Sequence, residues 1–193
     1  MDTDPGSDTA NGWRRHWRAL AIDRQRYRAL GHSTWAGAGF WSVVMYRLQN
    51  MAREARPDWL FMPARMLLGV LWRFLALATG IHISAEAEIG PGLVVPHPGA
   101  VWVTDRTKIG ARCTIFHGCT IGGSGPDDAT GTIIGDDVML SCQSTIIGKV
   151  AIGDGATIAA NTLVITDVPA GATAIGVPAK FLPVRAAPAK PAA

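Results

Sequence analysis

Aliphatic residues recur every six positions along the second half of the chain. The interval is broken twice: the step from Val101 to Ile109 is eight, and the step from Ile121 to Ile134 is thirteen. A step of six suits neither an α-helix nor the simple alternation of a strand. It predicts a triangular prism, in which each side is a short strand, three steps make one coil, and coils stack about 4.8 Å apart. The thirteen positions of this column are Ile83, Ile89, Val95, Val101, Ile109, Ile115, Ile121, Ile134, Leu140, Ile146, Ile152, Ile158 and Val164.

Before the repeat, apolar residues follow helical spacing instead. We predict three helices, over residues 12–30, 38–55 and 58–79, and in the second helix we expect Arg47 to point outward. The fold class is therefore mainly β, a parallel β-helix preceded by a small α-helical domain. The chain divides into a disordered segment 1–11, a helical domain 12–80, the prism 81–182 and a disordered tail 183–193.

The third helix, over 58–79, is apolar enough to raise the question of a membrane. A transmembrane helix needs about twenty predominantly apolar residues, and Arg65 and Arg73 interrupt this stretch. An arginine at mid-helix costs roughly 2.5–3.5 kcal/mol on insertion scales. We therefore expect a buried packing helix. The alternative is a peripheral helix that lies on a membrane surface, since Trp and Arg suit such an interface.

The chain has 193 residues, 48% of them hydrophobic, which is ample for one core. Its net charge of +3 is uneven, because residues 1–80 hold eleven Arg against six acidic residues. That region suits a phosphorylated ligand or an anionic membrane surface, although a solvated arginine-rich face would look the same; we expect no nucleic-acid partner. Without a visible signal peptide or a disulfide framework, we expect a cytoplasmic protein, at most peripheral to the inner face of a membrane.

The second break in the interval reads GGSGPDDATGTI. Four glycines, a proline and two aspartates cannot supply the missing aliphatic position, so this stretch predicts a loop that projects from the prism. Loops on rigid scaffolds carry function disproportionately. We expect this loop to border a site, and a tolerated insertion without a role is the alternative.

The phase of the interval places two histidines in one column. Grouping the steps in threes starts the third side of each coil at Val95, Ile115, Leu140 and Ile158. Two residues after each start lie His97, His117, Cys142 and Ala160. The two histidines should therefore stack on adjacent coils about one strand spacing apart. Below them, Cys142 and Ala160 would floor a narrow channel for a thin, extended ligand.

An imidazole exchanges protons near neutral pH, so this pair suits general base catalysis. Two ordinary surface histidines at a corner are the alternative interpretation. A zinc site like that of a carbonic anhydrase would need a third histidine within reach, and the remaining candidate, His82, sits at a different phase. We therefore expect no metal.

Several segments of the repeat resemble the serine acetyltransferases, a group of the hexapeptide-repeat acyltransferases. They are GIHISAEAEIGPGLVVPHPGAVWV, HGCTIGGSG, VMLSCQSTIIGKVAIGDGATIAANTLVITDVP and AIGVPAK. The resemblance implies a left-handed parallel β-helix, an exception to the usual right-handed crossover. It also implies a homotrimer, alone or paired as a dimer of trimers, with acetyl-CoA as the acyl donor at a subunit boundary.

The family's general base aligns with His97, which would take the proton of an acceptor hydroxyl as that oxygen attacks the thioester. His117 is the alternative base, and backbone N–H groups could stabilise the oxyanion. The resemblance places further residues along the donor: Gly122 and Gly123 in the loop, Cys142 and Ala160 beside the pantetheine arm, and Lys180 near the nucleotide. We expect direct transfer rather than a covalent carrier, because Cys142 has no adjacent basic partner.

The departures from the family pattern concern the acceptor. Pro96 replaces the aspartate before the family histidine, and His82 replaces the acidic residue fifteen positions earlier. The Arg-His pair that handles the serine carboxylate falls on about Thr130–Gly131. A carboxylate usually needs a cation, which Arg106 or Arg112 could supply instead.

The His-Pro-Gly form with a second histidine looks closer to relatives that acetylate sugars in polysaccharide pathways. We therefore predict an acetyl-CoA-dependent O-acetyltransferase that acts on a saccharide hydroxyl. The candidate acceptor residues are His82, Trp102, Arg106 and Arg112, with Trp102 placed to stack on a sugar ring. The alternatives are L-serine as the acceptor, in cysteine biosynthesis, and a non-catalytic scaffold, since fold does not imply function.

Overall fold

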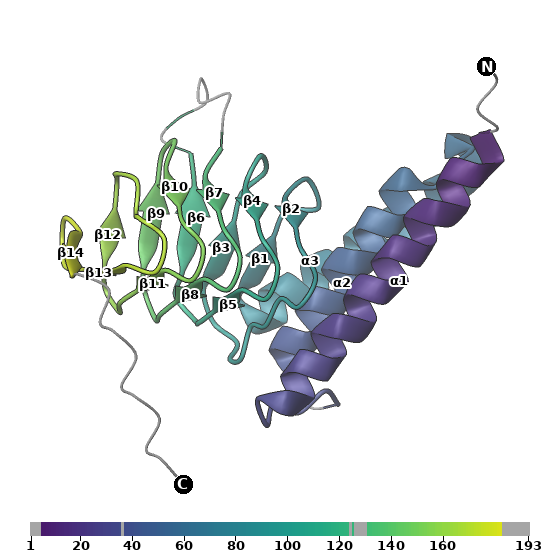
Figure 1. Ribbon diagram of the computed structural model, residues 1–193. Coiled ribbons are helices and arrows are strands. Elements are labelled where there is room, and N and C mark those ends of the chain that lie inside the picture. The colour runs from purple at the N-terminus through teal and green to yellow at the C-terminus, as the bar shows by residue number, and fades with distance from the viewer. Residues whose placement is uncertain (1–4, 36, 124, 126–130, 183–193) are drawn as a thin grey trace, which may run out of the picture.

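The structure is a computed structural model that describes residues 5–182, except residues 36, 124 and 126–130. Three helices form an arm that extends from one end of a prism of short strands (Figure 1). The helices are α1 (Pro5–Ala29), α2 (Ala38–Glu54) and α3 (Asp58–Thr79). Gly80 ends α3 in the left-handed conformation, and β1 begins at the next residue, so no linker separates the arm from the prism.

The prism has three sides, each a sheet of parallel strands that the chain visits once per coil. Sheet 1 contains β1 (Ile81–Ile83), β3 (Val101–Val103), β6 (Thr120–Gly122), β9 (Thr145–Ile147) and β12 (Leu163–Val164). Sheet 2 contains β2 (Glu88–Ile89), β4 (Lys108–Ile109), β7 (Ile133–Ile134) and β10 (Ala151–Ile152). Sheet 3 contains β5 (Thr114–Ile115), β8 (Met139–Leu140), β11 (Thr157–Ile158), β13 (Thr173–Ile175) and, antiparallel at the far end, β14 (Lys180–Leu182). The predicted left-handed parallel β-helix, preceded by an α-helical domain, is confirmed.

The core of the prism is the column that the interval predicts. All thirteen aliphatic residues are buried, with exposed fractions between 0% at Val95 and 9% at Ile89. Successive coils bring these side chains into contact through the parallel pairing of each sheet. The repeat therefore supplies the apolar interior, and the residues between its positions form the outer faces and the corners.

The first break in the interval lies one turn earlier than predicted. In the parallel pairing Val103, and not Val101, takes the place beside Ile83. The step of eight therefore runs from Val95 to Val103. Its two extra residues widen the turn that carries His97.

The turns of successive coils stack into three corners. The histidine corner joins sheet 3 to sheet 1 through residues 96–100, 116–119, 141–144 and 159–162. The turn 176–179, which connects β13 to β14, stacks on its last coil, since the Gly176 N–H donates to the Thr162 hydroxyl at 3.3 Å. The loop corner joins sheet 1 to sheet 2 and contains residues 84–87, 104–107, the described part of 123–132, 148–150 and 165–167. The docking corner joins sheet 2 to sheet 3 and contains residues 90–93, 110–113, 135–138, 153–156 and 169–172.

The helical arm caps the open end of the first coil, whose strands have no preceding coil to bond with. The Tyr46 hydroxyl donates to the Ala87 carbonyl at 2.7 Å and accepts the Ile89 N–H at 3.1 Å. Arg47 donates to the carbonyls of Ile89 and Gly90 at 2.7 and 2.6 Å. Side chains of α2 thus satisfy backbone groups that would otherwise be unpaired.

Side chains of helix α1 likewise form hydrogen bonds with backbone groups of the docking corner. Asp23 accepts the N–H groups of Gly92 and Leu93 at 2.6 and 2.9 Å and forms an ion pair with Arg47 at 2.9 Å. Arg26 donates to the Gly92 carbonyl at 2.6 Å. Asp23 and Arg47 are 0% and 3% exposed, so the pair is buried under the arm.

Two predictions for the arm are therefore wrong. Arg47 does not point outward, because its guanidinium is the counter-charge of Asp23 and a donor to the first coil. The segment 1–11 is not wholly irregular, because α1 begins at Pro5. Residues 1–4 and the predicted disordered tail 183–193 lie outside the described residues.

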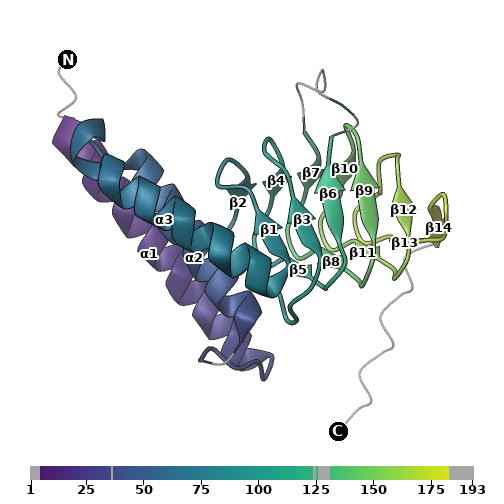
Figure 2. The ribbon, with the colours of Figure 1, turned by 180° about the vertical axis from the view of Figure 1, so that it is seen from behind.

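Helix α3 is not the buried packing helix that we expected. Only 6% of its most apolar stretch consists of buried residues, and Ala76 and Thr79 are the buried residues of the helix. The reason is geometric: the prism fills its own interior and α2 covers the open coil, so α3 packs on α2 along one stripe. Within the described residues, no element covers the other side of α3 (Figure 2).

Candidate active site

The histidine corner brings the predicted pair together. The ring centroids of His97 and His117 are 6.1 Å apart, with the rings at 69° to one another. The pairing of Val94 with Thr114 fixes this register between the first two coils. The widened turn includes Gly99 and Ala100 at positive φ, 117° and 44°, and His97 is the more exposed of the two imidazoles.

A third histidine joins this corner from the helical arm. His32 follows α1, and its ring centroid lies 6.2 Å from that of His97 and 6.2 Å from that of Tyr27. Sequence reasoning missed His32 because it lies outside the repeat, whose phase was the only signal that placed side chains relative to one another. The histidine corner is thus shared between the arm and the prism.

Cys142 lies directly below His117 in the column. Its Sγ is 3.7 Å from Nδ1 of His117, so the expectation that Cys142 has no adjacent basic partner is wrong. The other two thiols, Cys113 and Cys119, are buried inside the prism. Burial raises the pKa of Cys113 to about 11 and also raises the pKa of Cys119, so neither serves as a nucleophile.

The column continues away from the histidines along small residues. Ala160 occupies the next coil, since Asn161 N–H bonds to the Cys142 carbonyl at 3.0 Å. The turn 176–179, which stacks on the corner, leads directly to Lys180, an exposed residue of β14. From His97 to this turn there are four coil steps of about 4.8 Å, roughly 19 Å in all. The corner therefore presents a line of residues that begins with imidazoles and ends next to an ammonium group, and we call this line the track.

The glycine-rich loop lies at a different corner. Gly122 ends β6, where an added Cβ would lie 3.1 Å from Thr104, and Gly123 is exposed at the base of the loop. Gly131 packs so closely on the Arg106 carbonyl that a Cβ there would come within 2.2 Å. Arg106 therefore lies where the resemblance places the serine carboxylate pair. Thr130, the other member of that aligned pair, lies outside the described residues.

Arg112 is the candidate that the structure removes from the acceptor group. It lies at the docking corner, where it bonds Asp137 at 2.5 and 2.7 Å and Asp136 at 3.3 Å. Its guanidinium lowers the pKa of Asp137. The Arg112 guanidinium is therefore already paired with two carboxylates. It also lies at the docking corner, which is separate from the histidine corner.

His82 and Trp102 lie next to each other on the outer face of sheet 1. Their rings stack with centroids 4.5 Å apart and an angle of 30° between planes, and Trp72 of α3 meets His82 edge-on at 6.0 Å. Together they line a pocket of about 400 Å³ that also includes Gln49 and Asp105. Trp102 is 50% exposed, so one side of its indole is already occupied by His82 and the rest is open.

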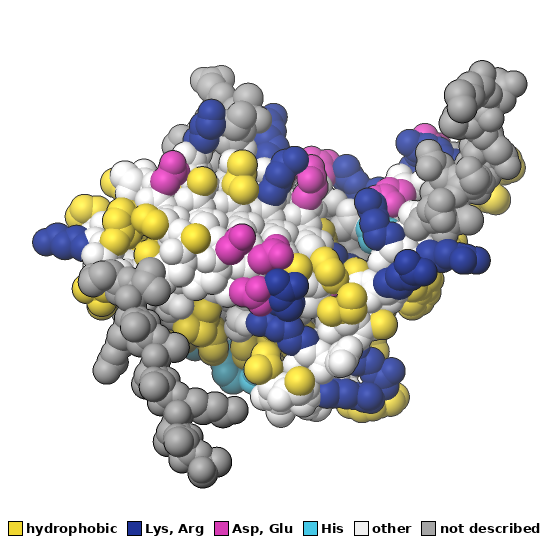
Figure 3. Space-filling model, in the orientation of Figure 1, with side chains coloured by type: hydrophobic (Ala, Val, Ile, Leu, Met, Phe, Trp, Pro, Cys, Tyr) yellow, Lys and Arg dark blue, Asp and Glu magenta, His cyan; other side chains and the backbone are white. Residues whose placement is uncertain are grey.

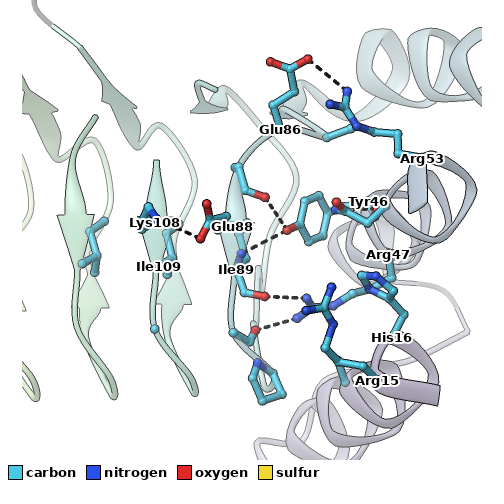
Figure 4. Close-up of a pocket in the computed structure, with 18 of the residues that line it drawn as sticks. Arg15, His16, Tyr46, Arg47, Arg53, Glu86, Glu88, Ile89, Lys108 and Ile109 are labelled. Atoms are coloured by element: carbon cyan, nitrogen blue, oxygen red, sulfur yellow. Dashed lines mark hydrogen bonds and ion pairs between the residues drawn. The ribbon is translucent and has the colours of Figure 1, made fainter. Parts of the chain in front are cut away.

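A larger cleft of about 1060 Å³ separates the arm from sheet 2 (Figure 4). Its charged groups pair with each other: Arg53 with Glu86 at 3.1 Å, and Lys108 with Glu88 at 3.2 Å. His16 pairs with Glu54 at 2.9 Å. The cleft lies on the opposite side of the prism from the histidine corner, so its size does not make it the catalytic site. No group of three or more His, Cys, Asp or Glu in the described part of the chain could hold a metal ion.

Known proteins resemble the chain over both the prism and the arm. Residues 131–166 match the family "Bacterial transferase hexapeptide (six repeats)". Over 145 residues the chain is 35% identical to a serine acetyltransferase of Helicobacter pylori, which covers 75% of this chain and 81% of that protein. The structure matches Neisseria gonorrhoeae serine acetyltransferase in complex with serine with a TM-score of 0.74 and 25% identity, over 86% of this chain and 69% of the other. A serine acetyltransferase in complex with CoA gives a TM-score of 0.73 and 25% identity, over 91% and 73%.

The triangular coil, the match to the hexapeptide family and the relatives define the chain as a hexapeptide-repeat acyltransferase. Within that class, the chain belongs to the serine acetyltransferase family. These relatives favour the serine alternative over the predicted saccharide acceptor.

Proposed function

We propose that this chain is a serine O-acetyltransferase that moves the acetyl group of acetyl-CoA to the hydroxyl of L-serine. The observation that carries the proposal is the column at the histidine corner, His97 and His117 above Cys142 and Ala160, in a chain of the serine acetyltransferase family. A neighbouring structure of that family holds CoA and another holds serine, which supports both substrates.

His97 is the general base of the proposed reaction. Its imidazole would accept the hydroxyl proton of the acceptor as that oxygen forms a bond to the thioester carbonyl carbon. The carbon–sulfur bond then breaks, and His97 would return the proton to the departing sulfur. His117 is the weaker candidate for this role, because its Nδ1 already faces the thiol of Cys142 at 3.7 Å.

The track along the histidine corner fits the donor. Small side chains at Cys142 and Ala160 leave room beside the column, and Lys180 places a cation at its far end. A nucleotide phosphate would bind that ammonium by a charge-assisted bond. The thioester, at the other end of the donor, would then lie beside the imidazoles.

The loop corner and the histidine corner lie on opposite borders of sheet 1, so one chain does not bring Gly122 and Gly123 to His97. We infer that a homotrimer completes the site, with the loop corner of one subunit facing the histidine corner of the next. Arg106, beside Gly131, would then offer its guanidinium to the carboxylate of serine.

A thiol-release assay with acetyl-CoA tests the proposal. Purified protein is incubated with L-serine and, in parallel, with nucleotide sugars, and the products are identified by mass spectrometry. Serine-dependent release of CoA with formation of O-acetylserine is the expected result, and His97→Ala serves as the folded control. A folded protein that acetylates a sugar and leaves serine unchanged would refute serine as the acceptor.

A further inference from the structure

Helix α3 presents a continuous apolar face to solvent, which we call the bare face. Successive residues of a helix are turned by about 100°, and on that spacing nine exposed residues form the centre of the face. They are Trp59, Leu60, Pro63, Leu67, Val70, Leu71, Phe74, Leu77 and Ala78. None is charged, and Arg73 lies at the border. A helix that is apolar over so wide an arc is found inside a protein or against a membrane.

The opposite stripe of α3 is attached to α2. Arg65, from the middle of that stripe, donates to the carbonyls of Ala52 and Ala55 at 2.7 and 2.9 Å and pairs with Asp58 at 3.1 Å. The Arg65 guanidinium therefore lies on the side of α3 that faces the protein, where it interacts with the carbonyl groups at the C-terminus of α2. The arginine that interrupts the apolar sequence does not interrupt the bare face.

We propose that the bare face lies on an anionic lipid surface, with α3 parallel to the membrane plane. The charge of the arm favours this partner, because residues 12–80 hold eleven Arg and three acidic residues. Figure 3, which views the arm from the α1 side, shows several of these basic side chains. Anionic headgroups attract such a region. A second copy of the arm would bring a like charge against it, which opposes pairing through this face.

The rest of the molecule requires α3 to lie on the surface rather than cross it. α2 runs alongside α3 and carries Asn50, Arg53 and Glu54, which a transverse orientation would draw into hydrocarbon (Figure 2). At its other end α3 passes through Gly80 directly into the prism, whose first coils expose charged residues such as Glu88, Asp105 and Lys108. A helix with one apolar side and one protein-bound side fits the boundary between headgroups and acyl chains.

Vesicle flotation of the full-length protein tests this proposal. The probes are phosphatidylcholine vesicles with and without phosphatidylglycerol, and the variants are Leu67→Glu and Phe74→Glu at the centre of the bare face. Leu30→Glu, just after α1, is the matched control, because Leu30 and Leu67 are similarly exposed at 50% and 60%. Light scattering and acetyltransferase activity are measured on the same samples.

We expect the wild-type protein and Leu30→Glu to float with the anionic vesicles. Each α3 variant should bind at least about tenfold more weakly, because a charge replaces buried apolar surface, while activity is unchanged. Wild-type protein that fails to float, or α3 variants that float as well as wild type, would overturn the proposal. So would α3 variants that change only the oligomer size, which would assign the face to a second copy, or wild-type protein that resists alkaline carbonate extraction, which would indicate a spanning helix.

Discussion

The docking corner and the histidine corner are built on the same repeat, but their polar side chains differ in how far they are hydrogen-bonded. Under the arm, the charged groups of Asp23, Arg26 and Arg47 bond to one another or to backbone groups of the first coils. In the described part of the chain, His97 makes only ring contacts, with His32, Phe116 and His117. Bonded polar groups fix the fold, whereas polar groups that keep their bonding capacity are available for chemistry.

The largest expected effect is on catalysis at the histidine corner. His97→Ala should lower kcat by roughly 10²–10⁴, because the general base is removed, while the thermal midpoint stays close to that of the wild type. Steady-state kinetics and calorimetry measure the two quantities. The control is His117→Ala; if His97→Ala turned over near-normally and His117→Ala did not, the base would be His117.

At the docking corner we expect a substitution to lower stability and to leave kcat unchanged. Asp23→Asn should lower the free energy of unfolding by about 3–5 kcal/mol, because Arg47 would remain buried without its counter-charge. Urea denaturation measures this loss, and kcat per folded protein should not change. Asp105→Asn, at an exposed aspartate, is the control. If Asp23→Asn reduced kcat without loss of stability, the separation between the two corners would fail.

The proposed path of the donor along the track can be tested by enlarging a side chain that lines it. Ala160→Trp should raise the KM for acetyl-CoA by about tenfold or more, since a bulky side chain would occupy the proposed path of the donor. The matched control is Ala151→Trp, at an exposed alanine of sheet 2 away from the corner. An unchanged KM for Ala160→Trp, with the protein folded, would move the donor elsewhere.

The acceptor side has a smaller predicted effect. Arg106→Gln should raise the KM for serine about three- to tenfold with little change in kcat, because a charge-assisted contact to the carboxylate is lost. Arg112→Gln should leave this KM unchanged, since the Arg112 guanidinium bonds Asp136 and Asp137. Equal effects of the two substitutions would remove Arg106 from the acceptor site.

The smallest effect is expected at the outer surface of the docking corner. Arg112 holds the pKa of Asp137 below the ordinary value of 3.8, so the pair stabilises the fold above that pH. This contribution fades as the pH falls through the lowered pKa, because the carboxylate is then protonated. Arg112→Ala should therefore melt slightly below the wild type at neutral pH, and the two midpoints should converge in acid. A difference that persists in acid would show that Arg112 acts through packing instead.

The sequence predicted the prism well because one column of aliphatic residues decides burial in every coil. It predicted the histidine column for the same reason, since a fixed phase fixes which side chains are neighbours. The two extra residues of the first break were placed one turn too late for an equally local reason. Val101 and Val103 are both apolar, so the pattern is consistent with two registers, and only the pairing of β1 with β3 decides between them.

The arm was less predictable because its burial depends on what it packs against. Helical spacing does not reveal that Arg47 bonds to Asp23 and the first coil, or that His32 reaches His97. It also suggested that the most apolar helix would be the most buried, whereas α3 is largely exposed. The acceptor residues depend on contacts between subunits in the proposed trimer, and one sequence carries no direct signal for these.

The capped first coil has a consequence for the association of one prism with another. A stack of parallel strands ends in rows of open hydrogen-bonding groups, onto which another stack can add, so repeat proteins need terminal caps. At one end β14 folds back antiparallel on β13. At the other end Tyr46, Arg47 and Asp23 occupy the backbone groups of the first coil. The arm thereby prevents the prism from acting as a template for end-to-end fibres, so a chain that loses the arm should polymerise.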